Sequence, residues 1–168
     1  RLLRATLPAR LTLDVQCDPG VPLVLADATQ IQQVLINLAT NALQAMPDGS
    51  GRIGVKLDSV QLDMDFVEPV PALQELFRSH RGRVARIAVS DTGHGMSPAT
   101  MARVFEPFFT TKPVGKGTGL GLGISKRIVE MHGGKLSIDD HCKNTRFIVE
   151  LPRGVTAEEL ERQQQLNR

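Results

Sequence analysis

Gly115-Lys116-Gly117-Thr118-Gly119-Leu120-Gly121-Leu122-Gly123 is the stretch that decides the fold, because it leads directly into an apolar-periodic segment that Gly133-Gly134 closes. So many glycines at the entrance of a helix indicate backbone N–H groups that can approach a ligand closely. Aligned N–H groups and the positive end of the helix dipole form an anion site, most often for phosphate. The alternative is a flexible loop that happens to precede a helix, and glycine-rich matches of this kind are often false positives.

Counting residues excludes two familiar phosphate loops. A dinucleotide fingerprint G-x-G-x-x-G needs a third glycine where this chain has Leu120, Leu122 or Ile124. A P-loop needs Gly-Lys followed by Ser or Thr, but a glycine follows Lys116 and a leucine follows Lys135. A nucleotide site in this chain therefore belongs to another class.

The composition is that of one ordinary globular domain. The chain has 168 residues, of which 41% are hydrophobic and 23% are charged, enough for a single core. A net charge of +2 gives no global field that would select nucleic acid. No apolar run approaches the ~20 residues of a membrane span, and the first residues given do not form the apolar h-region of a signal peptide. Cys17 and Cys142 form neither a disulfide framework nor a metal motif, so we expect a cytoplasmic domain without nucleic acid as a partner.

The strongest helix is predicted between Asp27 and Met46. Asp27 can cap it, and apolar residues recur at helical spacing on the face that would meet the core. A second stripe of the same helix carries only uncharged amides, namely Gln30, Gln33, Asn37, Asn41 and Gln44. A solvated face is one interpretation, although such a face normally carries Lys and Glu, both of which are absent between 28 and 46. The other is a partly enclosed site where Asn oxygens bind a hard cation, and the helix alone leaves both open.

Two further segments carry candidate ligand contacts. A strand at 84–90 leads into residues 91–96 (DTGHGM), where a carboxylate at a strand end can accept a hydrogen bond from a planar ligand. The glycines there let such a ligand lie against the backbone, although an ordinary Asp-Gly turn is the alternative. A short helix at 97–104 follows, with Ser as its N-cap and Pro at its first position. Residues 105–112 (FEPFFTTK) predict a loop that docks on an apolar surface.

The remaining chain is assigned by alternation and composition. Four more strands are predicted, at 11–15, 53–57, 135–139 and 146–151, the last two as a hairpin. Residues 58–82 are interpreted as a variable excursion without recognisable chemistry, with a short helix at 72–80. The expected organisation is a lead-in at 1–10, one domain at 11–153 and a polar tail or linker at 154–168.

Four segments match one pattern in chain order. Gln33–Ala42, Asp91–Met96, Phe105–Lys112 and Gly117–Leu122 resemble the N, G1, F and G2 boxes of the catalytic and ATP-binding domain of bacterial sensor histidine kinases. This domain falls within the wider superfamily of gyrase, Hsp90, histidine kinase and MutL ATP sites. The flanking strands extend the resemblance to about 11–152. The resemblance implies an α+β fold, a Bergerat-type two-layer α/β sandwich whose mixed sheet is covered on one face by three helices at 28–46, 97–104 and 119–132.

The resemblance also implies roles for individual residues. Asn41 would coordinate the Mg²⁺ that bridges the phosphates of ATP, with Asn37 beside it as a second catalytic and metal-binding residue. Asp91 would accept the adenine amino group, supported by Thr145. Lys112 or Lys116 would neutralise phosphate charge, and the sequence does not choose between them. The other residues implied for nucleotide binding are Gln44, Gly93, Gly95, Met96, Phe105, Gly117, Thr118, Gly119, Leu120, Gly121 and Leu122, of which 105–119 would form a mobile lid.

Two departures from the family pattern affect the interpretation. Sensor kinases often carry Lys and an aromatic residue three and four positions after the metal Asn, where this chain has Gln44 and Ala45. That difference puts more weight on the lid lysines and looks like a subgroup of the family. In the gyrase, Hsp90 and MutL branches, a Glu one turn before the metal Asn activates water, whereas this chain has Asn37, which cannot take a proton. Slow hydrolysis and transfer to a protein nucleophile are therefore expected.

The implied function is that of a protein-histidine kinase. The domain would bind Mg·ATP and transfer the γ-phosphate to a histidine on a separate helical dimerisation domain. None of the chain's four histidines stands in a helical context with a following acidic residue, so we expect the acceptor upstream of Arg1. The implied partners are that domain and the receiver domain of a response regulator, separate or fused. The fragment would be monomeric, and the full protein a homodimer that is soluble or membrane-anchored.

Three alternatives stay open at this point. The first is an ATP-driven conformational clamp of the Hsp90 or MutL type, which Asn37 and the Phe-rich box disfavour. The second is a nucleotide-binding module without transfer activity. The third is a related serine kinase acting on a regulator, which the F box also disfavours.

Overall fold

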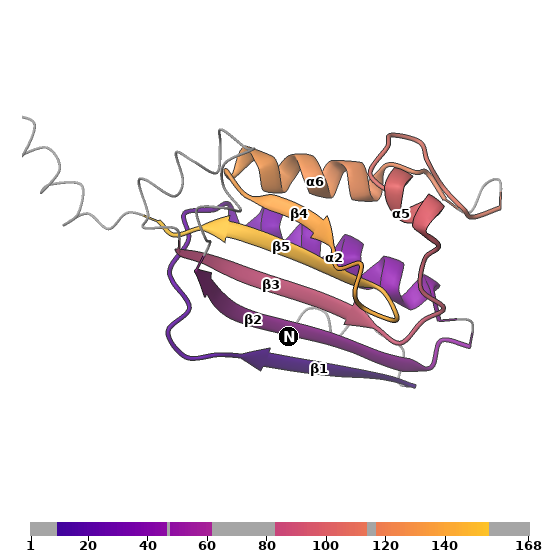
Figure 1. The fold of residues 1–168 in the computed structure, drawn as a ribbon, viewed down its shortest axis with the longest axis horizontal. Helices are drawn as coiled ribbons and strands as arrows, with labels where there is room; N and C mark the ends of the chain where they lie inside the picture. Colours follow the sequence, from indigo (N-terminus) through magenta and orange to yellow (C-terminus); the bar gives the residue numbers. More distant parts are fainter. Residues whose placement is uncertain (1–9, 47, 62–82, 114–116, 155–168) are drawn as a thin grey trace, which may run out of the picture.

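The computed structural model describes residues 10–46, 48–61, 83–113 and 117–154, which form a sheet with helices on one side (Figure 1). The five strands of the sheet are β1 (Leu11–Cys17), β2 (Gly51–Gln61), β3 (Arg83–Asp91), β4 (Lys135–Ile138) and β5 (Arg146–Pro152). The helices of the described residues are α2 (Ala28–Gln44), α5 (Pro98–Arg103) and α6 (Gly121–Met131). The predicted α+β fold class, a two-layer α/β sandwich, is confirmed.

The sheet is mixed, with the strand order β1-β2-β3-β5-β4. β1 pairs with β2 in parallel, and the other neighbours are antiparallel, including the predicted β4–β5 hairpin. Asp91 is the last residue of β3, the central strand, and lies opposite Ile53 of β2. Its carboxylate therefore stands at the end of that strand, beside the helical layer. The topology therefore delivers the strand-end carboxylate to the helices that carry the amide stripe and the glycine-rich entrance.

The core lies between α2, α6 and the inward-facing strand residues. Val34 and Leu38 of α2 are fully buried against a cluster that includes Ile53, Val129 and Val149. Each such side chain contributes about 1.5–3 kcal/mol of hydrophobic stabilisation relative to an exposed one. The apolar stripe predicted on α2 thus fixes which face of the helix turns inward and leaves the amide stripe beside the cleft described below.

Asp27 caps α2 and ties it to α6. The carboxylate of Asp27 accepts the N–H groups of Thr29 (2.8 Å) and Gln30 (3.2 Å), so α2 begins where the capping pattern predicts. Asp27 also donates its own N–H to Nε2 of His132 (3.0 Å), which ties the start of α2 to the end of α6. α2 ends at Gln44, two residues before the predicted end, because the Met46 N–H bonds to the Leu43 carbonyl in a tighter turn.

The structure also corrects the end of β2. β2 continues through Gln61, so Asp58 belongs to a strand and not to the excursion predicted from 58 onward. Asp58 is 6% exposed and forms a two-pronged ion pair with Arg86 on the neighbouring strand, with both N···O distances 2.8 Å. The sequence did not predict this strand end, because a buried charged residue on a sheet needs a partner that neutralises it. That partner, Arg86, lies on another strand 28 residues away.

The predicted helix at 72–80, residues 1–9 of the lead-in and the tail beyond residue 154 lie outside the described residues. None of the helices in the described part of the chain combines the length and the apolarity that crossing a membrane requires.

Candidate functional site

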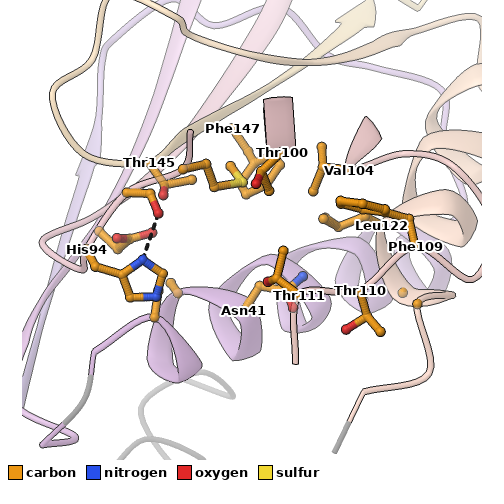
Figure 2. A pocket seen from close by; sticks show the side chains of 17 residues that line it. Asn41, His94, Thr100, Val104, Phe109, Thr110, Thr111, Leu122, Thr145 and Phe147 are labelled. Carbon is orange, nitrogen blue, oxygen red and sulfur yellow. Dashed lines mark hydrogen bonds between the residues drawn. The ribbon is translucent and has the colours of Figure 1, made fainter. Parts of the chain in front are cut away.

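An open cleft lies between α2, the loop after β3, α5 and the start of α6, with about 800 Å³ of space including the part open to solvent. In Figure 2, Asn41 of α2 and Thr111, from the segment after α5, lie on one side of the cleft. Thr145 and Phe147 lie on the other side. His94 stands at one end of the cleft in this view and Phe109 at the opposite end.

The structure brings together residues that the sequence assigned to three separate boxes and the β4–β5 hairpin. The predicted residues that line the cleft are Asn41, Asp91, Gly95, Met96, Gly119, Gly121, Leu122 and Thr145. Other predicted residues lie around it without lining it, namely Asn37, Gln44, Gly93, Phe105, Lys112, Gly117, Thr118 and Leu120. Lys116 lies outside the described residues.

Asp91 is the buried acid of the cleft, 8% exposed. Its Oδ1 accepts the N–H of Gly93 (2.8 Å), and its own N–H donates to the carbonyl of Thr145 (3.1 Å). The residue also lines the cleft, so its carboxylate can be reached by a ligand. Burial raises the pKa of Asp91 above its usual value, an effect that the Gly93 N–H and His94 partly offset. A carboxylate with one oxygen committed to backbone and one facing a cleft can accept a hydrogen bond from a ligand's amino group.

The loop after Asp91 is held by α2 and by the β4–β5 hairpin. A Cβ on Gly93 would lie 2.7 Å from the carbonyl oxygen of Ala45, so α2 fills the space that the missing side chain leaves. Asn144 donates its Nδ2 to the Gly93 carbonyl (2.8 Å), and His94 Nδ1 lies 2.8 Å from the Gly95 carbonyl (Figure 2). The close approach that the sequence indicated is therefore made first to α2, and this contact fixes the loop beneath the cleft.

The start of α6 keeps its first backbone N–H groups available. Leu120 is the N-cap and supplies no side-chain cap. Gly121 and Leu122, which belong to the first turn, where an α-helix leaves its N–H groups unpaired, line the cleft. Gly119 has φ +65°, and a Cβ there would lie 2.4 Å from the carbonyl carbon of Phe108. A glycine is required at that position for this helix entrance to exist, and the donors fit an anionic ligand such as phosphate.

The two asparagines of α2 have different surroundings. Asn41 lines the cleft. Asn37 donates its Nδ2 to the hydroxyl of Ser125 (3.2 Å) and to the carbonyl of Gly121 (3.4 Å), which joins α2 to the first turn of α6. Ser125 is fully buried, so this contact is shielded from water. The Nδ2 of Asn37 is thus used in packing, and its Oδ1 is the atom that it can offer to a ligand.

The three phenylalanines of the F box separate in the structure. Phe105 packs edge-on against Phe147, with 6.3 Å between ring centroids, as expected for docking on an apolar surface. Phe109 lines the cleft and lies under the guanidinium of Arg103, 4.5 Å from its ring centroid. Phe108 departs from that expectation, because it is 75% exposed with φ +66° and donates its N–H to the Gly119 carbonyl.

Nine lining residues were not predicted individually. They are Ala42, Ala45, His94, Thr100, Val104, Phe109, Thr110, Thr111 and Phe147. His94 and the residues at 109–111 stand inside the quoted boxes, so the boxes themselves could have indicated them. Thr100 and Val104 are four residues apart on and after α5, a spacing that places them on one face, although nothing in the sequence says which face meets the cleft.

The cleft offers a divalent cation few protein ligands. Within the described residues, no three His, Cys, Asp or Glu side chains gather as a metal site. The amide oxygen of Asn41 is a hard ligand of the kind that Mg²⁺ accepts, but Mg²⁺ needs six, mostly water and phosphate oxygens. The residues therefore fit a Mg²⁺ that arrives with a phosphorylated ligand rather than a resident ion.

Comparison with known proteins gives a consistent result. Residues 26–155 match the family model described as histidine kinase-, DNA gyrase B-, and HSP90-like ATPase. Sensor kinase CckA of Brucella abortus is 37% identical over 160 residues, which are 91% of this chain and 16% of that protein. Sensor protein FixL of Bradyrhizobium diazoefficiens is 41% identical over 119 residues, 71% of this chain and 19% of that protein. The chain thus spans less than a fifth of the length of these curated relatives.

Solved structures agree with the sequence matches. The catalytic domain of histidine kinase ThkA in a nucleotide-free form superposes with a TM-score of 0.62 at 31% identity, covering 86% of this chain and 81% of that one. ThkA has also been solved in complex with the response regulator protein TrrA, which matches at 29% identity and a TM-score of 0.58 and covers 86% of this chain and 34% of that one.

Proposed function

The chain belongs to the histidine kinase-, DNA gyrase B-, and HSP90-like ATPase family and matches the catalytic domains of sensor histidine kinases, and from this premise we propose that it binds Mg·ATP and transfers the γ-phosphate to a protein histidine. The observation that carries the proposal is one cleft with an amino-group acceptor, Asp91, and an uncapped helix start at Gly121. Adenine and phosphates are the two ends of ATP that need these two chemistries.

The geometry supports a defined orientation of the nucleotide. The adenine amino group would donate to Oδ2 of Asp91 while Met96 lies against the base. The phosphates would meet the first N–H groups of α6 and the amide oxygen of Asn41. Mg²⁺ brought with the phosphates would supply charge neutralisation there. Thr118 and Leu120, at the glycine-rich entrance, would contribute backbone to the same end.

The transfer itself requires a nucleophile from outside the described cleft. A ring nitrogen of a histidine attacks the γ-phosphorus in line, the bond from phosphorus to the β,γ-bridging oxygen breaks, and ADP leaves with the electron pair. The imidazole N–H proton passes to solvent or to a base of the acceptor domain. Within this chain, catalysis then consists of positioning the triphosphate and stabilising its charge.

An exposed apolar surface stands next to the phosphate end. Phe108 is 75% exposed, Leu120 36% and Ile124 44%, and the Phe108 N–H bonds to Gly119 at the helix entrance. A non-glycine residue in the left-handed region costs about 1–2 kcal/mol, so the fold holds Phe108 outward against a local preference. A helical domain bringing the histidine to the γ-phosphate would meet this surface. Its two-fold assembly would make the full protein a homodimer, and the phosphohistidine would pass to a response-regulator receiver domain in the cytoplasm.

The ATPase alternative lacks support at one position. A water-activating base is needed one helical turn before Asn41, and that residue is Asn37, whose amide nitrogen already donates to α6. We expect this domain to hydrolyse Mg·ATP slowly by itself.

The test uses the full polypeptide that contains these residues, incubated with radiolabelled ATP. Acid-labile, alkali-stable phosphohistidine should form with wild-type protein and disappear in the Asp91→Asn variant. The isolated domain should bind Mg·ATP by calorimetry and hydrolyse it only slowly in the steady state. ATP binding with no phosphohistidine would favour a nucleotide-binding module, and rapid hydrolysis by the isolated domain would favour a clamp.

A further inference from the structure

Lys112 reaches across the fold to the amide stripe of α2. The ammonium of Lys112 donates to Oε1 of Gln44, 68 residues away in the sequence. The Lys112 N–H donates to the hydroxyl of Thr110 (3.1 Å), which fixes the backbone just before the lysine side chain leaves it. The residue is half-buried, and its contact with Gln44 lies at the exposed surface of the fold.

Gly117 provides the space for this lysine. A Cβ at Gly117 would lie 2.6 Å from the Thr110 hydroxyl and 3.0 Å from Cδ of Lys112. The backbone at Gly117 therefore packs directly against the aliphatic part of the Lys112 side chain. Lys112 is thus held in three ways. Thr110 accepts its backbone N–H, Gly117 packs against its aliphatic chain, and Gln44 accepts its ammonium.

The position of the ammonium follows from the helical period. Asn37, Asn41 and Gln44 are spaced by four and three residues, so they form one line on the face of α2. One end of the line contacts Gly121 at the start of α6, through Nδ2 of Asn37, and the other end contacts Lys112. Asn41, which lines the cleft, stands between them. A phosphate chain lying over Asn41 would therefore have the helix N–H groups on one side and Lys112 on the other.

The charge of Lys112 is available in this arrangement. No ion pair joins it to a carboxylate within the described ranges, whereas Lys56 and Lys126 each pair with an acidic side chain. An amide oxygen orients an ammonium without neutralising it. The ammonium has three N–H donors, and those that Gln44 does not use can donate to a phosphate oxygen, an anionic acceptor that gives a shorter and stronger hydrogen bond than a neutral one.

We propose, resting on the proposed function, that Lys112 is the cation that binds the nucleotide's terminal phosphates and that Gln44 is its positioning residue. Gln44 accepts one N–H of the ammonium and holds it beside Asn41, and the remaining N–H groups of the ammonium donate to the phosphates while that contact persists. Gln44 stands where the resemblance expects a lysine, so the lid delivers from Lys112 a charge that the helix does not carry.

The test compares Mg·ATP with adenosine on a set of variants by calorimetry. Lys112→Gln should weaken Mg·ATP binding about 10- to 100-fold, the usual effect of losing a charge-assisted hydrogen bond, and leave adenosine affinity unchanged. Gln44→Ala should weaken Mg·ATP binding severalfold in the wild-type background and not at all in the Lys112→Gln background, because a positioning residue acts only through its partner. The exchanged pair, Gln44→Lys with Lys112→Gln, should recover most of the lost affinity.

The control is Lys56→Gln, which removes the same charge from the outer face of the sheet and should not change either affinity. Wild-type Mg·ATP affinity in Lys112→Gln would overturn the inference, and so would an equal loss of adenosine and Mg·ATP binding. Independent effects of the two substitutions would overturn the positioning role of Gln44. The proposed function fails separately, if wild-type protein binds neither Mg·ATP nor adenosine.

Discussion

Replacing Asp91 by Asn should lower nucleotide affinity without lowering the stability of the ligand-free domain. This difference tests the role of Asp91 in the cleft. Asp91 is 8% exposed and lines the cleft, and its Oδ1 accepts the Gly93 N–H. An Asn has the same shape and can still give one oxygen to Gly93, but it then presents an NH₂ group to the ligand. Two donors, the new amide and an adenine amino group, would face each other where an acceptor is needed.

The expected losses and gains have opposite signs. One charge-assisted hydrogen bond is worth about 1.5–3 kcal/mol, so adenine-nucleotide affinity should fall about 10- to 150-fold. Burial raises the pKa of Asp91, so its ionisation opposes folding. The contribution of Asp91 to stability is fully present below the ordinary aspartate pKa and is lost as pH rises through the raised pKa. Above the raised pKa this contribution is absent, and Asp91→Asn should leave the ligand-free domain at least as stable there.

The assay combines calorimetry with ADP and adenosine and thermal unfolding of the ligand-free domain. Asp58→Asn is the matched control, because it makes the same chemical change to a buried aspartate on the outer face of the sheet. It should lower the unfolding temperature and leave nucleotide affinity unchanged. Unchanged affinity in Asp91→Asn, or a loss of stability as large as that of Asp58→Asn, would refute the assignment of Asp91 as a buried acceptor for the ligand.

Three further predictions follow from the same structure. Asp58→Asn should lower the free energy of unfolding by about 1–3 kcal/mol, because it leaves Arg86 unpaired. Arg86 holds the pKa of Asp58 below its usual value, so the stabilities of wild type and variant, measured by urea unfolding, should converge as pH falls through that lowered pKa. Gly119→Ala should cost at least about 1–2 kcal/mol, because φ is +65° and the added Cβ meets the backbone of Phe108, and nucleotide affinity should fall with it; wild-type unfolding midpoints would contradict this. Asn41→Ala should remove the increase in ATP affinity that Mg²⁺ gives, measured with and without EDTA, while adenosine binding persists as the control.

Much of the cleft could be predicted because several of its residues lie in short boxes whose chemistry is local. Asp91 at a strand end, Asn41 on an amide stripe and Gly121 at a helix entrance each carry a signal within a few residues of sequence. Asn37 could not be placed in this way. The sequence puts it on the same stripe as Asn41, but only the packing of α6 against α2 commits its amide nitrogen to Ser125 and Gly121.

Two other features depended on contacts between distant segments. Asp58 looks like part of an acidic excursion until Arg86 stands opposite it on β3. Phe108 looks like its neighbours in the F box, and its outward position follows from the hydrogen bond to Gly119 and a left-handed backbone. Neither arrangement has a local signature, since each depends on the partner that the fold supplies.

The sequence by itself determined the helices, the strands, the order of the boxes and the chemistry that they offer, because capping, periodicity and glycine content act over a few residues. The tertiary structure alone decided which of those groups face one another. It set Asp91 and the start of α6 around one cleft, buried Ser125 under Asn37, and carried Lys112 to Gln44. The physical reason is that side-chain partners 68 to 88 residues apart meet only after α2, α6 and the sheet have packed.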